Sequence, residues 1–243
     1  FDESFDLLSQ VFLHPALPEA EVELNRQRLL SALKHEQETP DGLLGLLNNK
    51  TIFGKHPYAN RPGGTEETVK SLTKAQLVAH AKLLQDPKRL LVVAVGDVEP
   101  QRLFDAVRKA FGQLPQGSYA PVATPPVKFD KAALTTQALK IPTNYINAIF
   151  PAPRWTDADF AAGLVATNAL SYRFFEEVRT KRNLSYAPHA SVQTRAAVPL
   201  GSLYVTAVDP NTTLKVMFDE VKKLQTTPMT DAELTGTKSV FLS

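Results

Sequence analysis

The stretch EEVRTKRNLSYAPHA, residues 176–190, decides how this chain is interpreted. Two acids open it, basic residues follow, and an Asn-Leu-Ser-Tyr turn leads into a predicted strand. Phe174 and Val178 lie on one apolar arc of a helical wheel, and Arg179 falls at the edge of that arc. An arginine in the last turn of a helix and a tyrosine at the start of a strand are ordinary surface features. Alternatively, Arg179 and Tyr186 face one binding site.

Helical patterns dominate the first 115 residues. Pro18 suits the first position of a helix, and Thr73 with Gln76 forms a capping box ahead of another helix. The run LLVVAV reads as a buried strand because it is uniformly apolar and ends at Gly96-Asp97. The sequence therefore predicts helices over 1–13, 18–37, 41–53, from 73 and over 101–114, with a strand over 90–95.

A proline-rich segment without helical or strand periodicity follows. QGSYAPVATPPVKFD, residues 116–130, contains three prolines and no periodicity, so we expect a linker over 116–131. Strand-like and helical segments follow it. The expected strands cover 133–141, 145–153, 184–194 and 201–208, and the expected helices run from Thr156 to about 182, over 211–225, and from a cap at Thr230 with Glu233.

Helices and strands thus mix without regular βαβ alternation, which predicts the α+β class. A faint echo supports two related modules: FDLLSQVFLHPALPEAE near the start and FDEVKKLQTTPMTDAE near the end share Phe-Asp, a proline and a helix-opening Ala-Glu. We expect the C-terminal part of a first module over 1–115 and the N-terminal part of a second over 132–243.

Composition excludes several classes of function. The net charge is +2 and the basic residues are interspersed with acids, so we expect no nucleic-acid partner. No apolar run approaches the roughly 18–20 residues that span a bilayer, which predicts no membrane span. The chain has no cysteine, which excludes disulfides and thiolate zinc sites.

The histidines do not predict a metal site. The five are His14, His35, His56, His80 and His189. No two have the i, i+4 spacing that directs two imidazoles to one ion, whereas catalytic zinc commonly takes three protein ligands. The chain also lacks a nucleophile elbow and a P-loop.

FEEVRTKRNLSYA, residues 175–187, closely resembles the F-x-E-V-R-x-x-x-x-L-x-Y signature in the second half of pitrilysin/insulinase-type zinc peptidases, the inverzincins. Three further stretches resemble successive landmarks of that family's first half: FLHPALPEAEVELNRQRLLSAL, FGKHPYANRPGGTEETVKSLT and LLVVAVGDVEPQRLFDAVRKAFGQLP. The resemblance implies a tandem pair of related α+β modules that enclose a substrate chamber.

The resemblance also implies that this member is degenerate. The family's H-x-x-E-H zinc motif would lie upstream of Phe1, and the position of its further glutamate ligand falls on Ala32, with Ser31 beside it. Neither side chain is a competent zinc ligand at neutral pH. We therefore expect no catalytic residue, metal or cofactor in this chain. Arg179 and Tyr186 match the pair that binds substrate peptide in the family.

The expected function is that of a non-catalytic subunit, which contributes Arg179 and Tyr186 to an active site whose zinc lies on a partner chain. One alternative is an active single-chain zinc endopeptidase with its metal motif upstream of this sequence. Another is a structural or assembly subunit. The expected partners are a zinc-bearing homologous subunit and a peptide substrate, and unpaired strand edges favour a homo-oligomer. The resemblance suggests the bacterial periplasm or another exported compartment.

Overall fold

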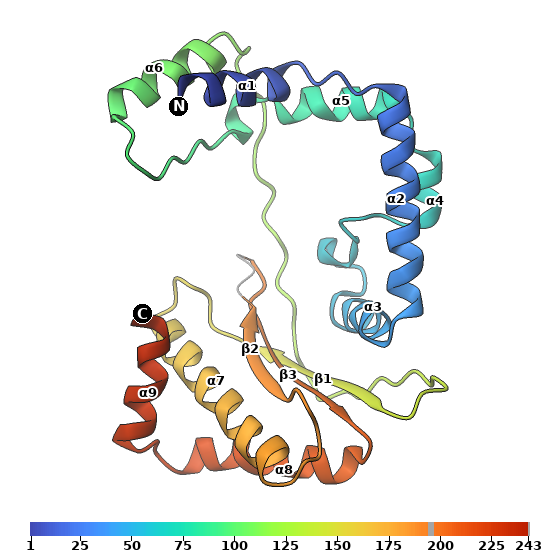
Figure 1. The fold of residues 1–243 in the computed structure, drawn as a ribbon, viewed down its shortest axis with the longest axis vertical. Helices are drawn as coiled ribbons and strands as arrows, with labels where there is room; N and C mark the ends of the chain where they lie inside the picture. The colour runs from blue at the N-terminus through green and yellow to red at the C-terminus, as the bar shows by residue number, and fades with distance from the viewer. Residues whose placement is uncertain (194–196, 243) are drawn as a thin grey trace. The chain divides into compact units, whose positions relative to one another are not determined.

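The computed structural model describes residues 1–193 and 197–242 and divides the chain into two compact units (Figure 1). Unit 1 comprises residues 1–34 and 61–123, and unit 2 comprises residues 35–60 and the described part of 124–243. Helices and a small antiparallel sheet are both present, so the predicted α+β class is confirmed. The predicted boundaries at 115 and 132 separate two modules along the sequence, whereas these units are defined by contacts in space. The module boundaries stay a prediction.

The helices of the first half follow the sequence prediction closely. They are α1 (Asp2–Leu13), α2 (Glu19–Glu38), α3 (Pro40–Phe53), η1 (Pro57–Ala59), α4 (Glu66–Ser71), α5 (Lys74–Leu84), η2 (Pro87–Arg89) and α6 (Pro100–Phe111). Thr73 and Gln76 form the predicted capping box at the start of α5. In unit 1, α1 packs on α6 through edge-to-face contacts of Phe5 and Phe12 with Phe111.

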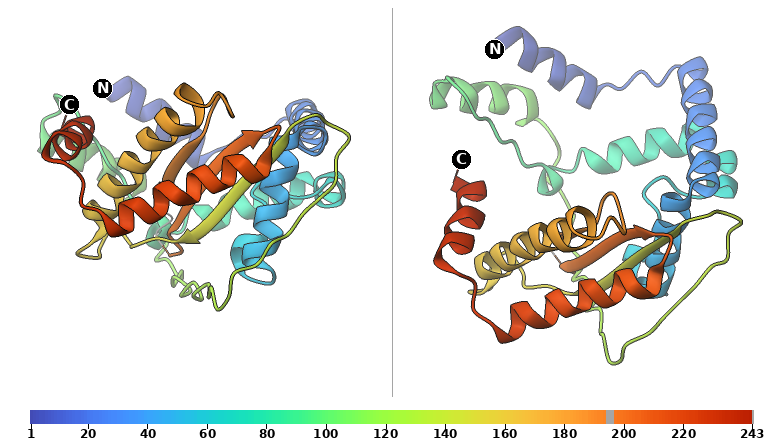
Figure 2. Two further views of the ribbon diagram at one scale, coloured as in Figure 1. Left: turned by 90° about the horizontal axis from the view of Figure 1, so that it is seen from below. Right: turned by 60° about the horizontal axis from the view of Figure 1, so that its bottom comes forward.

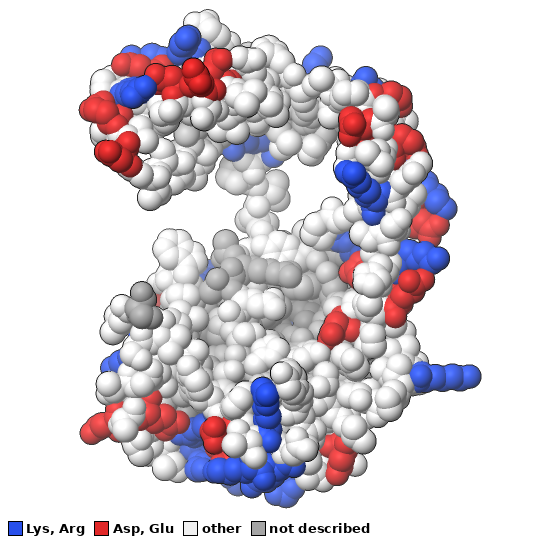
Figure 3. All heavy atoms as spheres, viewed as in Figure 1, with Lys and Arg blue, Asp and Glu red and all other residues white. Residues whose placement is uncertain are grey.

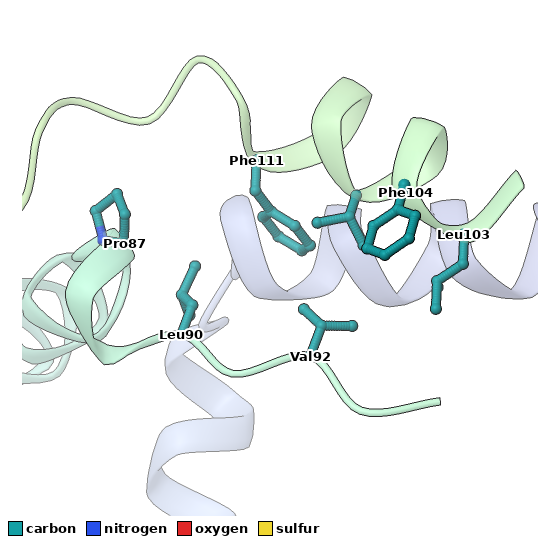
Figure 4. A pocket seen from close by; sticks show the side chains of 7 residues that line it. Pro87, Leu90, Val92, Leu103, Phe104 and Phe111 are labelled. Carbon is teal, nitrogen blue, oxygen red and sulfur yellow. The ribbon is translucent and has the colours of Figure 1, made fainter. Parts of the chain in front are cut away.

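The predicted buried strand over 90–95 is wrong. Leu90 and Val92 line an apolar groove of about 340 Å³ beside α6 (Figure 4), but Leu91, Val93 and Val95 are 86%, 73% and 96% exposed. A strand needs a neighbour to pair its backbone groups, and no described residue of unit 1 belongs to a strand. The apolar run is therefore extended, unpaired and open on its outer face.

We expect Val93→Lys to reduce self-association of the chain, because an exposed apolar segment with free edges pairs readily with another copy. Sedimentation velocity at micromolar concentration should show a shift toward the monomer, with an unchanged unfolding midpoint. Val122→Lys is the matched control, because Val122 is 90% exposed outside the run and should change neither quantity. Equal effects of the two variants on self-association would show that the exposed run over 90–95 does not cause it.

Unit 2 is built on a three-stranded antiparallel sheet. Its strands are β1 (Asn144–Pro151), β2 (His189–Gln193) and β3 (Leu200–Ala207), in the order β1-β3-β2. Its remaining helices are α7 (Phe160–Phe174), the π-helical turn η3 (Phe175–Thr180), α8 (Pro210–Thr226) and α9 (Asp231–Leu242).

Helices α7 and α8 lie side by side along one face of the sheet (Figures 1 and 2). The core of unit 2 fills the space between these helices and the sheet. Its buried members are Leu170, Phe174, Val178, Ala190, Leu203, Val205 and Met217. On the other face of the sheet, Phe53 at the end of α3 packs against Leu200 and Ile149. The predicted strands over 145–153 and 201–208 and the helix over 211–225 are confirmed.

The predicted strand over 133–141 is wrong. Leu134 and Leu139 are five positions apart, so a strand would point them to opposite faces, and no single layer could bury both. Leu134 is instead 90% exposed, and the segment runs along a groove of about 1370 Å³ beside the free edge of β1.

Two boundaries also differ from the prediction. The helix predicted from Thr156 begins at Phe160, because Asp157 accepts a hydrogen bond from the Arg154 amide and forms a turn first. Strand β2 begins only at His189. The last residue of the predicted strand over 184–194 lies outside the described residues.

Acidic and basic atoms are interspersed over α1 and α6 in the view of Figure 3. In the described part of the chain, no helix combines the length and the apolar character needed to cross a bilayer.

Candidate functional site

The segment that carries Arg179 changes its helical form. Helix α7 continues without a break into the π-helical turn η3, where the Lys181 amide donates to the Glu176 carbonyl five residues back, at 2.9 Å. π turns are rare in proteins as a whole, and a large share of them lie at functional sites. The wider turn keeps Val178 fully buried and leaves Arg179 half-buried at the surface.

A tight turn then brings Tyr186 back to the helix. Asn183 has a φ of 51°, a left-handed conformation that asparagine tolerates better than most residues. The Leu184 amide donates to the Val178 carbonyl, which closes the end of the helix. The C-cap residue of η3 is Lys181, and Asn183 forms the left-handed turn two residues after it. Tyr186 lies before β2 and is 76% exposed, so its predicted place inside a strand is wrong.

Arg179 and Tyr186 lie together. The central carbon of the Arg179 guanidinium is 4.1 Å from the centroid of the Tyr186 ring and 4.7 Å from that of Phe175. Both distances are within the range of cation–π contact. The guanidinium therefore contacts two aromatic rings, and the Arg179 and Tyr186 side chains lie next to each other.

The polar groups of this pair remain available for a ligand. Among the described residues, no carboxylate or carbonyl accepts a hydrogen bond from the Arg179 guanidinium, and the Tyr186 hydroxyl has no partner. A guanidinium in contact with ring faces keeps its N–H groups, which can donate to oxygen acceptors of a ligand. The site can thus present several donors at a solvent-exposed surface.

The neighbouring basic residues are occupied elsewhere. Lys181 and Arg182 both bind the Glu177 carboxylate, at 2.5 Å and 2.6 Å, and Glu177 has its pKa lowered by Lys181 first and by Arg182 second. Glu177 therefore holds two cations away from the ring pair. Of the basic side chains in 176–190, Arg179 alone has no acidic partner among the described residues.

Helix α7, which leads into the site, is fixed to α9 by a bidentate ion pair. Arg173 donates to both carboxylate oxygens of Glu233, at 2.6 Å and 2.9 Å, and the two side chains are only 15% and 28% exposed. The predicted cap at Thr230 is confirmed, since its hydroxyl accepts from the Glu233 amide.

We expect Glu233→Gln to lower the free energy of unfolding at pH 7 by about 1–3 kcal/mol, because it leaves a mostly buried guanidinium without its charge partner. Chemical denaturation measures the change. The pKa of Glu233 is lowered from its ordinary value of 4.5, chiefly by the Arg173 hydrogen bond. The stabilisation is therefore complete above about pH 4.5 and is lost as the pH falls through the lowered pKa. The gap between wild type and variant should close in acid.

Glu66→Gln is the matched control, because Glu66 pairs with Lys70 in full exposure and the change should have no measurable effect. A gap between wild type and Glu233→Gln that persists unchanged at pH 3 would contradict the ion-pair explanation.

The described residues of this chain do not form a zinc site. Ala32 and Ser31 lie in α2, and neither offers a zinc ligand at neutral pH. Across residues 1–193 and 197–242, no group of three or more histidine, aspartate or glutamate side chains is arranged to hold a metal ion.

The contact between Arg179 and the Phe175 ring was not predicted from the sequence. The signal was their i, i+4 spacing on a helix, which brings two side chains onto one face. The π turn had no signal that sequence periodicity could detect.

Two comparisons connect this geometry with known proteins. The family model described as the peptidase M16 inactive domain matches residues 71–241. An uncharacterized zinc protease of Mycobacterium leprae is 26% identical over 213 residues, which cover 84% of this chain and 47% of that protein. The chain thus spans about half the length of this relative.

Solved structures share the fold. A crystal structure of a peptidase M16 inactive domain from Pseudomonas fluorescens superposes with a TM-score of 0.90 at 21% identity, covering 99% of this chain and 60% of that one. The periplasmic protease PqqL from Escherichia coli gives a TM-score of 0.77 at 16% identity, covering 99% of this chain and 27% of that one.

The family predicted from the motif at residues 175–187 is confirmed, because the family model covers more than half of the chain and includes that motif. This chain belongs to the peptidase M16 inactive-domain family.

Proposed function

We propose that this chain is a non-catalytic peptidase subunit that holds an extended peptide substrate through Arg179 and Tyr186. The observation that carries the proposal is the stacked pair itself: a guanidinium 4.1 Å from a phenol ring, with the polar groups of both free among the described residues.

The chemistry of the two groups suits the backbone of a peptide. Carbonyl oxygens of an extended peptide are planar acceptors, and a guanidinium and a phenol can each donate to one. Such donors position the peptide and stabilise negative charge that develops on a carbonyl oxygen during cleavage. Phe175 and Tyr186 hold the guanidinium between them, so little side-chain entropy is lost on binding.

The metal chemistry is assigned to a second polypeptide. The described residues contain no group of side chains arranged to hold zinc, and the chain spans about half the length of a relative named as a zinc protease. We therefore propose a zinc-bearing M16 subunit of the same organism as the partner. An exported location, such as the periplasm in which PqqL is named to act, goes with this proposal.

Reconstitution tests the proposal. The purified chain and the zinc-bearing subunit are assayed separately and together with a library of quenched fluorogenic peptides, and zinc is measured in each sample. We expect no stoichiometric zinc and no cleavage with this chain alone, and cleavage only when both subunits are present.

Cleavage by this chain alone, or zinc bound to it, would favour the single-chain endopeptidase. A stable complex of the two subunits that cleaves none of the peptides would favour the structural subunit instead.

A further inference from the structure

The sheet face opposite α7 and α8 carries a line of three polar side chains. Asn147 on β1 and His189 on β2 both stand directly opposite Tyr204 on the central strand β3. Residues directly opposite one another point to the same face, and alternation turns them away from the core residues Ala148 and Leu203. We refer to Asn147, Tyr204 and His189 as the polar row.

Asp41, in the first turn of α3, joins this row. The Tyr204 hydroxyl donates to Asp41 Oδ1 at 2.6 Å, and the His189 ring lies 5.0 Å from the Tyr204 ring, tilted by 33°. Burial, and then the hydrogen bond to Asp41, raise the pKa of Tyr204 further above its ordinary value, so the phenol is the donor in this contact. The hydroxyl proton of Tyr204 is used in the hydrogen bond to Asp41 and is not available to a ligand.

The polar capacity that remains in the cluster is mostly that of acceptors. Asn147 Oδ1 is buried and has no hydrogen-bond partner among residues 1–193 and 197–242. Asp41 is exposed, and within the same residues its carboxylate receives the Tyr204 hydroxyl and no second side-chain donor. The Tyr204 oxygen can still accept, as can one nitrogen of a neutral His189. Asn147 Oδ1 has almost no exposed surface, so a ligand meets the acceptors of Asp41, Tyr204 and His189 and must bring donors.

We propose that Asp41 and the polar row form a subsite for a basic side chain, lysine or arginine, of the bound peptide. Ammonium and guanidinium groups donate only, and they carry the charge that complements Asp41. The stacked His189 and Tyr204 rings offer an apolar surface for the alkyl stem of such a side chain.

This subsite deepens the proposed function and rests on it. His189 follows Tyr186 by three residues, a stretch of chain that spans at most about 11 Å. One extended peptide can therefore reach both the Arg179–Tyr186 pair and the polar row. The subsite would select which peptides bind, whereas the pair would bind a backbone of any sequence.

A purely structural role for Asp41 has a different signature. The Tyr204–Asp41 hydrogen bond also joins α3 to the sheet, so its loss could loosen unit 2 without any effect on selectivity. The readout must therefore be the preference between two peptides, with the thermal midpoint of each variant measured alongside.

The test uses fluorescein-labelled, N-acetylated ten-residue peptides with one lysine at successive positions, each paired with a norleucine counterpart. Acetylation removes the terminal amine as a competing cation. By fluorescence anisotropy we expect the full chain to bind the best lysine peptide about 10-fold more tightly than its counterpart, in line with one charge-assisted hydrogen bond. Asp41→Asn should reduce this preference to about 2-fold or less and leave the affinity for the norleucine peptide unchanged.

A control variant completes the design. Asp219→Asn, at an exposed aspartate of α8 paired with Lys215, should keep the full preference. Equal weakening of both peptides by Asp41→Asn would show a structural role and overturn the subsite.

Equal binding of both peptides by the unaltered chain would also overturn the subsite, while the Arg179–Tyr186 proposal would stand. Binding of neither peptide would overturn both proposals.

Discussion

Replacing Arg179 by alanine is expected to lower kcat/KM of the proposed complex between this chain and a zinc-bearing subunit by about 10²–10³-fold, the loss typical when one preorganised donor to a developing oxyanion is removed. The guanidinium contacts the Phe175 and Tyr186 rings and donates no hydrogen bond to the described residues of its own chain. Its removal should therefore affect the bound peptide far more than the fold. Steady-state cleavage of one fluorogenic peptide measures the change.

Arg182→Ala is the matched control. Arg182 lies three residues further on, is exposed, and binds Glu177, so its loss should change kcat/KM by less than about 2-fold. The zinc content and the subunit affinity of the complex should be the same for both variants. An unchanged kcat/KM in Arg179→Ala would refute the role assigned to this residue.

Phe174→Ala is expected to lower the free energy of unfolding by about 3–5 kcal/mol. The Phe174 side chain is fully buried in the core of unit 2, where it packs among residues of α7, α8 and the sheet. Alanine would leave a cavity in a region that has no solvent to fill it. Equilibrium urea denaturation measures the loss.

Phe218→Ala tests whether burial is the cause, because Phe218 lies on α8 and is 52% exposed. We expect its cost to be below about 1 kcal/mol. A loss in Phe174→Ala no larger than that of Phe218→Ala would show that this core is not the main source of stability.

The elements that the sequence predicted well carry their own signals. Prolines and capping side chains set the starts of α3, α5 and α8, and β3 shows the alternation of a strand with one apolar face. The runs over 90–95 and 133–141 were mispredicted because strand propensity does not supply a partner. A strand forms only where another chain segment pairs its backbone.

The candidate site also has a part that the sequence predicted and a part that only the folded chain shows. Arg179 and Tyr186 could be identified from their spacing and from the family motif, because both depend on residue order. Their distance of 4.1 Å depends on the π turn and on the left-handed Asn183, which no periodic pattern reveals. The Tyr204–Asp41 contact joins residues 163 positions apart, so only the folded chain brings it into view.

The π turn has a consequence for comparing sequences across this family. A homologue with one residue fewer in this segment can restore ordinary α geometry, because a π turn accommodates one extra residue in a helix. The side chains within the turn, Arg179 among them, then take different directions, since successive residues of an α-helix are spaced by about 100° and those of the wider π turn by less. A relative could keep an arginine at the aligned position and still direct it away from its tyrosine. Gap placement between residues 175 and 180, rather than residue identity alone, therefore decides whether a homologue retains the stacked pair.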